Sequence, residues 1–297
     1  MSDDAGIWVA GEALIDLVPN ESNGRLAIVG GGPANTAKAL ANLGHFTQFI
    51  GGISSDDFGK AIETELMSYG VKLDFAHFSN LPTATATVTL DETGSAEYEF
   101  FLTDTATFDF YQDWLPQAKP KVLHVGTLAT IVEPGATELL NWAKNRGAPI
   151  VFDPNVRPSV LSDSVRYRDY VEKWMRISSV VKMSEEDFSW LYPQRISASE
   201  LLEFGPRLIV ITHGAKGLTA YQSSSFTEVT GVKVDVVDTV GAGDTVGAII
   251  VESIAQVGLD QTLEKIEKVL KRAAKAAAIT CSRLGARPPS KDELLES

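Results

Sequence analysis

The chain has 297 residues, of which 44% are hydrophobic and 22% are charged, with 24 Gly and 13 Pro. This is the composition of an ordinary globular protein, and it excludes a disordered or collagen-like chain. There are 26 Lys and Arg against 39 Asp and Glu, and the net charge of −13 argues against nucleic acid or an anionic membrane surface as a partner. Residues 1–120 hold 5 of the basic and 17 of the acidic side chains, so an anionic ligand is expected on the remainder, whose net charge is −1.

Three further features narrow the class of protein and its location. The N-terminal segment has no basic flank before an apolar core, so it does not read as a signal peptide. No uninterrupted apolar run approaches the ~18 residues of a membrane-spanning helix. The only cysteine, Cys281, lies in an apolar run, which excludes an intrachain disulfide and indicates a small buried side chain. These features predict a soluble, cytoplasmic protein with no membrane partner.

Along the chain, short apolar strands alternate with helical patterns, which is typical of βα units on a largely parallel sheet. A cap at Ser55 is expected to start the second helix. The expected strands are 7–10, 47–51, 122–125, 150–153, 180–183 and 208–212, and the expected helices are 33–43, 57–69, 134–146, 164–175, 184–191, 245–257 and 263–284.

Two stretches depart from this alternation. Residues 25–29 read as a short strand, and residues 83–90 and 96–102 alternate around a turn at 91–94, which predicts a β-hairpin. We therefore expect a small β-sheet lid, formed by about residues 13–30 and 80–105. No repeat, low-complexity tract or linker divides the chain, so a single α/β domain spanning residues 1–297 is predicted.

The strongest chemical signal is residues 238–244, DTVGAGD, which follow a strand-like run at 232–237 and open a helix. The glycines allow a tight turn that brings successive N–H groups together, and the helix dipole adds positive potential there. Such a turn suits a phosphoryl group in transfer, and Asp244 at its rim could accept the proton of an attacking hydroxyl. The alternative is a plain strand-to-helix turn in which Asp244 is a first-turn acid.

Other glycine motifs fit less well. The chain contains no G-x-x-x-x-G-K-[ST] string, and residues 30–35, GGGPAN, lack the last glycine of a dinucleotide fingerprint. This second stretch instead suits a hydroxylated ligand, because the Asn35 amide both donates and accepts hydrogen bonds. Asp16, expected at the end of the first strand, supplies an acceptor for paired hydroxyls. Read singly, each of these is equally consistent with a turn or loop residue.

Two more polar stretches follow predicted strands, where ligands of open α/β sheets collect. Residues 153–158, DPNVRP, offer Asn155 and Arg157, and Arg157 either meets a phosphate or lies on the surface. Residues 212–217 fit a nucleotide-phosphate loop or a β-turn. The four histidines show no metal-ligand spacing, and His124 is expected to be a satisfied core residue.

In order along nearly the whole chain, these segments resemble the PfkB (ribokinase-like) family of carbohydrate kinases. Within that family, GEALIDLVP, DPNVRP and VKMSEEDF are similar to the fructokinase branch. The stretches that carry the resemblance are Gly11 and Glu12 with Asp16, and residues 30–35, 50–59, 124–126, 153–158, 182–187, 212–217, 238–244 and 283–288.

The resemblance implies a ribokinase-like three-layer fold, with a sugar held between the central sheet and the lid and ATP alongside. It makes Asp244 the catalytic base and the backbone N–H groups of Gly241, Ala242 and Gly243 the site of the transferring phosphate. It assigns Asp16, Gly31, Gly32 and Asn35 to the sugar, with Asn155 and Arg157 as further substrate candidates. The nucleotide residues are then Lys182, Thr212, Gly214, Gly217, Gly243 and Lys275, and the metal residues are Asp187 and Glu186 for Mg²⁺ and Asp238 and Val240 for a monovalent cation such as K⁺.

Five positions depart from the family pattern. Residues 184–187 read SEED where the family has Asn-x-x-Glu, which leaves open which carboxylate faces Mg²⁺. Val246 replaces a common Phe, Ile249 stands where a small residue is usual, and Lys275 stands where members often carry Asn or His near the adenine. The nucleotide preference and the fine choice of sugar therefore stay open.

The function that follows is ATP-dependent phosphorylation of a sugar's primary hydroxyl, with D-fructose converted to fructose 6-phosphate as the first choice. The alternatives are a 2-keto-3-deoxygluconate kinase, a ribokinase, a nucleoside kinase, or a non-catalytic sugar-binding relative. Lid strands present edges that a second subunit could cover, so a homodimer through the lid is also expected.

Overall fold

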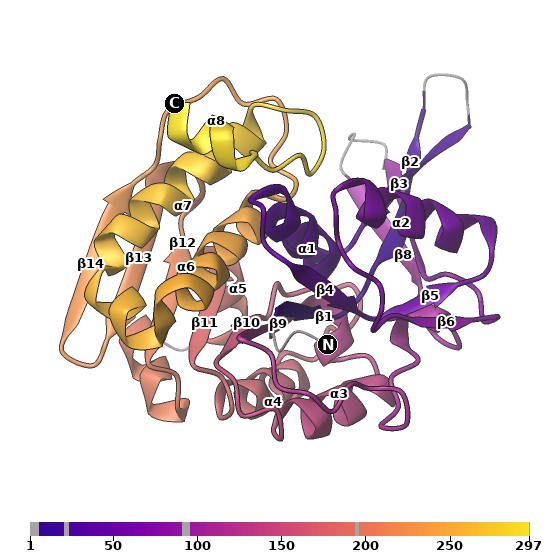
Figure 1. Cartoon of the computed structure of the whole chain (residues 1–297), viewed down its shortest axis with the longest axis horizontal. Helices are drawn as coiled ribbons and strands as arrows, with labels where there is room; N and C mark the ends of the chain where they lie inside the picture. The colour runs from indigo at the N-terminus through magenta and orange to yellow at the C-terminus, as the bar shows by residue number, and fades with distance from the viewer. Residues whose placement is uncertain (1–5, 21–23, 91–95, 194–195, 297) are drawn as a thin grey trace.

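The computed structural model describes residues 6–20, 24–90, 96–193 and 196–296. Its centre is an eight-stranded sheet in the order β14-β13-β12-β11-β10-β9-β1-β4 (Figure 1). The six strands from β12 to β4 run parallel, and the pairs β12–β13 and β13–β14 are antiparallel. The strands are β1 (Ile7–Ala10), β4 (Thr47–Ile50), β9 (Val122–Gly126), β10 (Ile150–Asp153), β11 (Val180–Ser184), β12 (Leu208–Thr212), β13 (Gly217–Gln222) and β14 (Ser225–Thr230).

Helices cover both faces of this sheet, so the parallel strands are buried on two sides and are nearly continuous apolar runs. In β1, Val9 packs into one core with side chains of α1, α2, α6 and α7, while its neighbour Trp8 packs into the other core with α3, α4 and α5. In Figure 1, α1, α6 and α7 lie above the central strands and α3 and α4 below them. The helices are α1 (Gly32–Asn42), α2 (Asp57–Ser68), α3 (Gly135–Ala143), α4 (Ser164–Met175), α5 (Glu185–Leu191), α6 (Ala242–Glu264), α7 (Ile266–Cys281) and α8 (Lys291–Glu296).

A second sheet of four strands, in the order β3-β2-β7-β8, projects from the main body and is called the lid sheet below (Figure 1). The predicted hairpin is confirmed as β7 and β8; its turn at 91–94 lies outside the described residues. A third sheet pairs β5 with β6. These strands are β2 (Leu14–Pro19), β3 (Arg25–Gly30), β7 (Thr85–Leu90), β8 (Ala96–Phe101), β5 (Gly52–Ser54) and β6 (His77–Ser79).

The three-layer α/β fold and its six parallel strands are confirmed, each strand within one residue of its predicted bounds. Three expectations were wrong. Residues 232–237 form no strand, because the β13–β14 hairpin already occupies that end of the sheet. Asp16 lies within β2 of the lid sheet, not at the end of the first strand. The cap of α2 is Asp56 rather than Ser55, since the Asp56 carboxylate accepts a hydrogen bond from the Gly59 N–H at 2.7 Å.

Helices α6 and α7 also differ from their predicted bounds, and α7 spans Ile266–Cys281 where a helix over 263–284 was expected. Helix α6 starts three residues earlier than expected, at Ala242, and runs to Glu264 across a non-helical break at Gly258. It is long and apolar enough to cross a membrane by length and composition alone, but more than half of the apolar window is buried inside the protein. Because it packs against α1, α7 and the central sheet, α6 is a core helix.

Candidate active site

The predicted site residues meet where the parallel strands end and α6 begins. Strand β10 ends at Asp153, β11 at Ser184 and β12 at Thr212, all on the same edge of the sheet. In open α/β sheets this edge is where ligands bind. The N-terminus of α6 adds unpaired backbone N–H groups and the positive end of a helix dipole to it.

The turn before α6 has the shape of an anion-binding loop. Gly241 caps the helix at a φ of 79°, and a Cβ atom there would lie 2.6 Å from the Cβ of Ala286, so only glycine fits. The Ala242 N–H makes a long 3.3 Å bond to the Thr239 carbonyl, and the first-turn N–H of Gly243 has no intrahelical acceptor.

Asp238 and the chain after α7 brace this turn. The Asp238 carboxylate accepts hydrogen bonds from the N–H groups of Val240 at 3.0 Å and Gly285 at 2.9 Å. The carbonyl of Cys281 accepts from the N–H groups of Val237 and Asp238. The turn is therefore held in place before any anion arrives.

Asp244 lies on the first turn of α6 and is buried, with 8% of its surface exposed. Its Oδ2 accepts a hydrogen bond from the Asn35 side-chain amide at 2.9 Å. Burial raises the pKa of Asp244, and the charge of Lys182 and the bond from Asn35 only partly oppose this. A carboxylate made more basic in this way is suited to take a proton from a hydroxyl group.

A buried ion pair lies under the glycine turn. Lys182 Nζ is 2.6 Å from Asp153 Oδ2, and a Cβ atom at Gly243 would lie 3.0 Å from the same ammonium. Burial alone would lower the pKa of Lys182, but the carboxylates of Asp153 and Asp244 outweigh it and the pKa is raised, so the ammonium stays charged. This puts a fixed positive charge beside the anion-binding turn.

On the other side of Asp244, polar atoms from three segments surround Gly32 on α1. A Cβ atom at Gly32 would lie 2.6 Å from Thr127 Oγ1, 3.2 Å from Asn155 Nδ2 and 3.3 Å from Asp244 Oδ1. The Asn35 Oδ1 is buried and has no hydrogen-bond partner among the described residues. The threonine hydroxyl and the asparagine amides both donate and accept hydrogen bonds, and the carboxylate accepts them, so together these groups suit a ligand with several hydroxyls.

Asp16 and Arg157 complete this side of the site. The Asp16 carboxylate lies against the backbone of Gly30, where any side chain would strike it. Burial raises the pKa of Asp16 to about 6, and the charge of Arg157 partly opposes this. Arg157 is held to its own loop, because its Nη1 donates to Asn155 Oδ1 at 2.9 Å and to the Asn155 and Val156 carbonyls.

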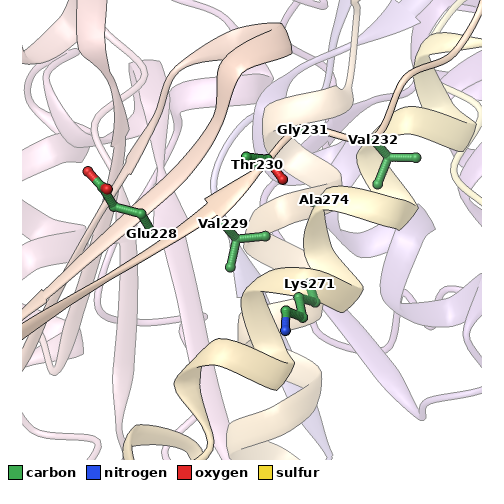
Figure 2. A pocket seen from close by; sticks show the side chains of 7 residues that line it. All are labelled: Glu228, Val229, Thr230, Gly231, Val232, Lys271 and Ala274. Atoms are coloured by element: carbon green, nitrogen blue, oxygen red, sulfur yellow. The ribbon is translucent and has the colours of Figure 1, made fainter.

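The predicted nucleotide loop is a short turn after β12. The His213 N–H donates to the Gly217 carbonyl at 2.8 Å, and the Gly231 N–H donates to the Lys216 carbonyl at 3.1 Å. These bonds place the loop of Thr212, Gly214 and Gly217 beside the end of β14. Next to that end is a pocket of about 370 Å³ between residues 228–232 and α7. Figure 2 labels the residues that line it.

Two predicted residues have structural partners instead. Lys275 Nζ donates to the Leu294 carbonyl at 2.8 Å, so it ties α7 to α8. Both oxygens of Asp187 accept backbone hydrogen bonds, from Val156 and from Ser184, where Asp187 completes the capping box of α5. Asp187 is therefore occupied as a cap, while Glu186 beside it is exposed. Within the described ranges, no group of three acidic, histidine or cysteine side chains could hold a metal ion.

Thr127 and Asp153 were not predicted from the sequence as site residues, and the prediction that His124 is a satisfied core residue was wrong in part. The DPN motif contains Asp153, and a charged residue that ends a buried strand is a usable signal. Thr127 gave none, because its position depends on contacts between distant segments. His124 is buried as expected but not satisfied: its Nδ1 has no partner in the part of the chain that the structure describes, and burial lowers its pKa to about 3.

Comparison with known proteins settles the family. Residues 5–293 match the model of the pfkB family carbohydrate kinases. A fructokinase of Salmonella typhimurium is 31% identical over 298 residues, which cover 95% of each chain. The chain belongs to the pfkB family. It is a carbohydrate kinase, and hence a transferase.

Crystal structures of other family members agree with this fold. A fructokinase with bound ATP from Xylella fastidiosa has a TM-score of 0.91 at 26% identity, covering 98% of this chain and 97% of that chain. A fructokinase from Vibrio cholerae O395, in its fructose, ADP and calcium ion bound form, has a TM-score of 0.86 at 28% identity and covers 99% of both chains. The ribokinase-like fold predicted for this pfkB kinase is thereby confirmed.

Proposed function

We propose that this protein phosphorylates D-fructose at its 6-hydroxyl with ATP as the donor. The observation that carries the proposal is the position of Asp244, which lies between the anion-binding turn of α6 and the polar atoms around Gly32. Relatives named fructokinase support fructose over the other sugars, and a 2-keto-3-deoxygluconate kinase, a ribokinase or a nucleoside kinase is less favoured.

In this mechanism Asp244 removes the proton from the sugar hydroxyl as that oxygen attacks the terminal phosphorus of ATP, and the bond from this phosphorus to the bridging oxygen breaks so that ADP leaves. The Asn35 amide orients the carboxylate, since it holds Oδ2 and leaves Oδ1 beside Gly32. The N–H groups of Gly241, Ala242 and Gly243 receive the charge that develops on the phosphoryl oxygens, and the ammonium of Lys182 adds to this. Because these groups are fixed beforehand, little reorganisation is needed during transfer.

The sugar is held by Asp16 and Asn35, with the backbone of Gly31 and Gly32 in close contact and Asn155 at the far side. Arg157 contributes through the loop that it fixes. We further propose that the base of ATP lies in the pocket between residues 228–232 and α7, with its phosphates passing Thr212, Gly214 and Gly217 (Figure 2). Lys275 serves this region indirectly, through its tie to α8.

The residues present fit a water-coordinated Mg²⁺ rather than a protein cage. Asp187 is occupied as a cap, and the exposed Glu186 is the carboxylate left to hold water molecules of such an ion. When bound, Mg²⁺ neutralises charge on the ATP phosphates. For a monovalent cation such as K⁺, the Asp238 carboxylate is engaged with backbone N–H groups, so the loop at Val240 would contribute its carbonyl oxygens.

We also propose that the lid sheet closes over the sugar, that the whole chain acts as one domain, and that the enzyme works in the cytoplasm, where ATP is available. Closure would exclude water, which otherwise competes with the sugar for the phosphoryl group.

The test is ADP release, measured with purified protein and a panel of fructose, ribose, 2-keto-3-deoxygluconate and nucleosides. Fructose is expected to give the highest kcat/KM, and the product should be fructose 6-phosphate. A higher kcat/KM with another member of the panel would reassign the substrate. A sugar-induced rise in Tm without any ADP release would instead indicate a non-catalytic sugar-binding protein.

A further inference from the structure

The backbone at Thr127 is strained, and its side chain faces the candidate sugar site. Thr127 begins the short 3₁₀ helix η2 (Thr127–Thr130), directly after β9. Its φ is +58°, in the left-handed region that β-branched residues avoid. Its side chain is buried, with 4% exposed. Strain of this kind persists only where the surroundings enforce it, and it is often found at binding sites.

Two hydrogen bonds hold Thr127 in this conformation. The Thr130 hydroxyl donates to the Thr127 carbonyl at 2.6 Å. The buried Glu12 carboxylate accepts from the N–H of Ala129 at 3.0 Å and so fixes η2 to the loop after β1. Neither bond uses the Thr127 hydroxyl. A glycine would satisfy the same backbone without strain, so the fold by itself gives no reason for a threonine here.

The Thr127 hydroxyl points toward Gly32, where Asn155 and Asp244 also place polar atoms. It accepts a hydrogen bond from Asn155 Nδ2 at 3.4 Å. Because a hydroxyl has one proton to donate as well as lone pairs to accept, its own proton is left for another oxygen. Asp244 Oδ1 lies around the same glycine, so that oxygen would belong to the part of the sugar next to the reacting group.

We propose that the Thr127 hydroxyl donates a hydrogen bond to a hydroxyl of the sugar and helps to set sugar specificity. The proposal rests on the proposed function, because it takes the ligand beside Asp244 to be the sugar. The strained backbone at residue 127 then has a use, because it places a hydroxyl group beside Gly32, and a glycine at residue 127 would offer no hydroxyl there.

Three variants separate sugar binding from backbone strain. Thr127→Gly removes both the hydroxyl and the strain, Thr127→Val removes the hydroxyl and keeps the strain, and Thr127→Ser keeps the hydroxyl. The KM for fructose is expected to rise about tenfold in the Gly and Val variants, the scale of one lost hydrogen bond, and to stay near the wild-type value in the Ser variant. The KM for ATP should not change in any of them.

Melting temperatures provide the second readout. The Gly and Val variants both lose the bond from Asn155. Thr127→Gly also relieves the backbone strain and should melt no lower than the wild type, whereas Thr127→Val keeps the strain and should melt lower. If the KM for fructose rises in both the Gly and the Val variant while their melting temperatures differ, a loss of stability cannot be the cause of the higher KM. Thr262→Ala is the matched control, because the Thr262 hydroxyl is buried and bonded to Gly258 at the far end of α6. That control should lower the Tm and leave both KM values unchanged.

A set of monodeoxy fructoses identifies the sugar hydroxyl. For the analogue that lacks it, wild type and Thr127→Val should have the same KM, and for the others the difference should persist. The inference is wrong if the Gly and Val variants bind fructose as the wild type does, or if every analogue keeps the full difference. A wild type that phosphorylates none of the sugars would instead refute the proposed function.

Discussion

At the scale of single residues, the site depends on carboxyl groups that burial makes more basic. Asp244, Asp16, Asp153 and Glu12 all have raised pKa values, and in each case burial is the main cause. Their environments nevertheless differ. Asp153 is neutralised by Lys182, Asp244 is oriented by Asn35, and Glu12 accepts a backbone hydrogen bond with no cation bonded to it among the described residues.

The first prediction concerns Asp244→Asn. The substituted amide still offers an oxygen to Asn35, so the fold should be retained, while the group that accepts the proton is lost. Turnover is expected to fall at least ~10²-fold, the usual scale for a positioned base. The measurement is kcat by ADP release together with the Tm. Near-normal turnover in this variant would show that Asp244 is not the base.

The second prediction concerns Glu12. Burial raises its pKa from 4.5 to about 7, so the folded protein keeps this proton at pH values where the unfolded chain has lost it. A raised carboxyl pKa stabilises the fold below pH 4.5, and that contribution is lost as the pH rises to about 7. Relative to Glu12→Gln, the wild type should therefore lose up to about 3 kcal/mol of unfolding free energy between pH 4.5 and 8.

Urea denaturation of the two proteins at several pH values measures this difference. A stability difference that does not vary with pH would mean that Glu12 ionises in the folded protein as readily as in the unfolded chain.

At the scale of elements, the sequence located strands well and connections poorly. The six parallel strands are apolar on both faces, so each one is a short run of apolar residues that can be recognised from the sequence alone. Residues 232–237 have the same valine-rich pattern, yet they lie exposed on the surface and form no strand. The hairpin of β13 and β14 already occupies the end of the sheet where they could have paired. The site residues within motifs could be named for the same local reason. Thr127 could not, because three distant segments define its surroundings.

A third prediction tests the turn before α6. Gly241→Ala introduces a Cβ atom at positive φ and against Ala286, which should lower stability by roughly 1–3 kcal/mol and displace the N–H groups of the turn. The kcat should fall by ~10²-fold or more.

Gly258→Ala is the matched control for Gly241→Ala. Gly258 has a similar φ of 82° on the same helix, and a Cβ atom there meets nothing within 4 Å. It should lose stability to a comparable degree but keep its kcat. Equal losses of kcat in the two variants would mean that backbone strain, rather than the shape of the turn, limits turnover.

At the scale of the whole molecule, the acidic and the nearly neutral parts of the sequence supply different parts of the candidate site. Residues 1–120 form the lid sheet, α1 and α2 and supply Asp16 and Asn35, which are proposed to hold the sugar. The anion-binding turn, Lys182 and the proposed nucleotide pocket all come from the nearly neutral remainder. In the proposed mechanism the anion is bound by backbone N–H groups, a helix end and one lysine. A net charge of −13 therefore argues against nucleic acid as a partner but does not argue against a nucleotide.

The fourth prediction belongs to this scale and concerns assembly. Leu26 and Ile28 lie on the edge strand β3 with 55% and 41% of their surfaces exposed, and their register puts them on the face of the lid sheet that carries Asp16. A second lid could cover this apolar edge. Sedimentation should give a homodimer for the wild type and a monomer for Leu26→Asp.

Val165→Asp is the control for assembly, because Val165 is an exposed apolar residue on α4, outside the lid sheet. It should remain dimeric. A monomeric wild type at micromolar concentration would exclude the lid interface.

The brace on the turn before α6 also bears on how the enzyme is made. Gly285, Ala286 and the carbonyl of Cys281, which hold or border that turn, are translated after it, whereas Asp16 and Asn35 on the sugar side are translated early. During synthesis Asp16 and Asn35 are therefore present well before the turn is fixed. A chain that has been synthesised only as far as the turn lacks the segment that holds the turn in place, so phosphate transfer must wait until residues 281–286 have been added.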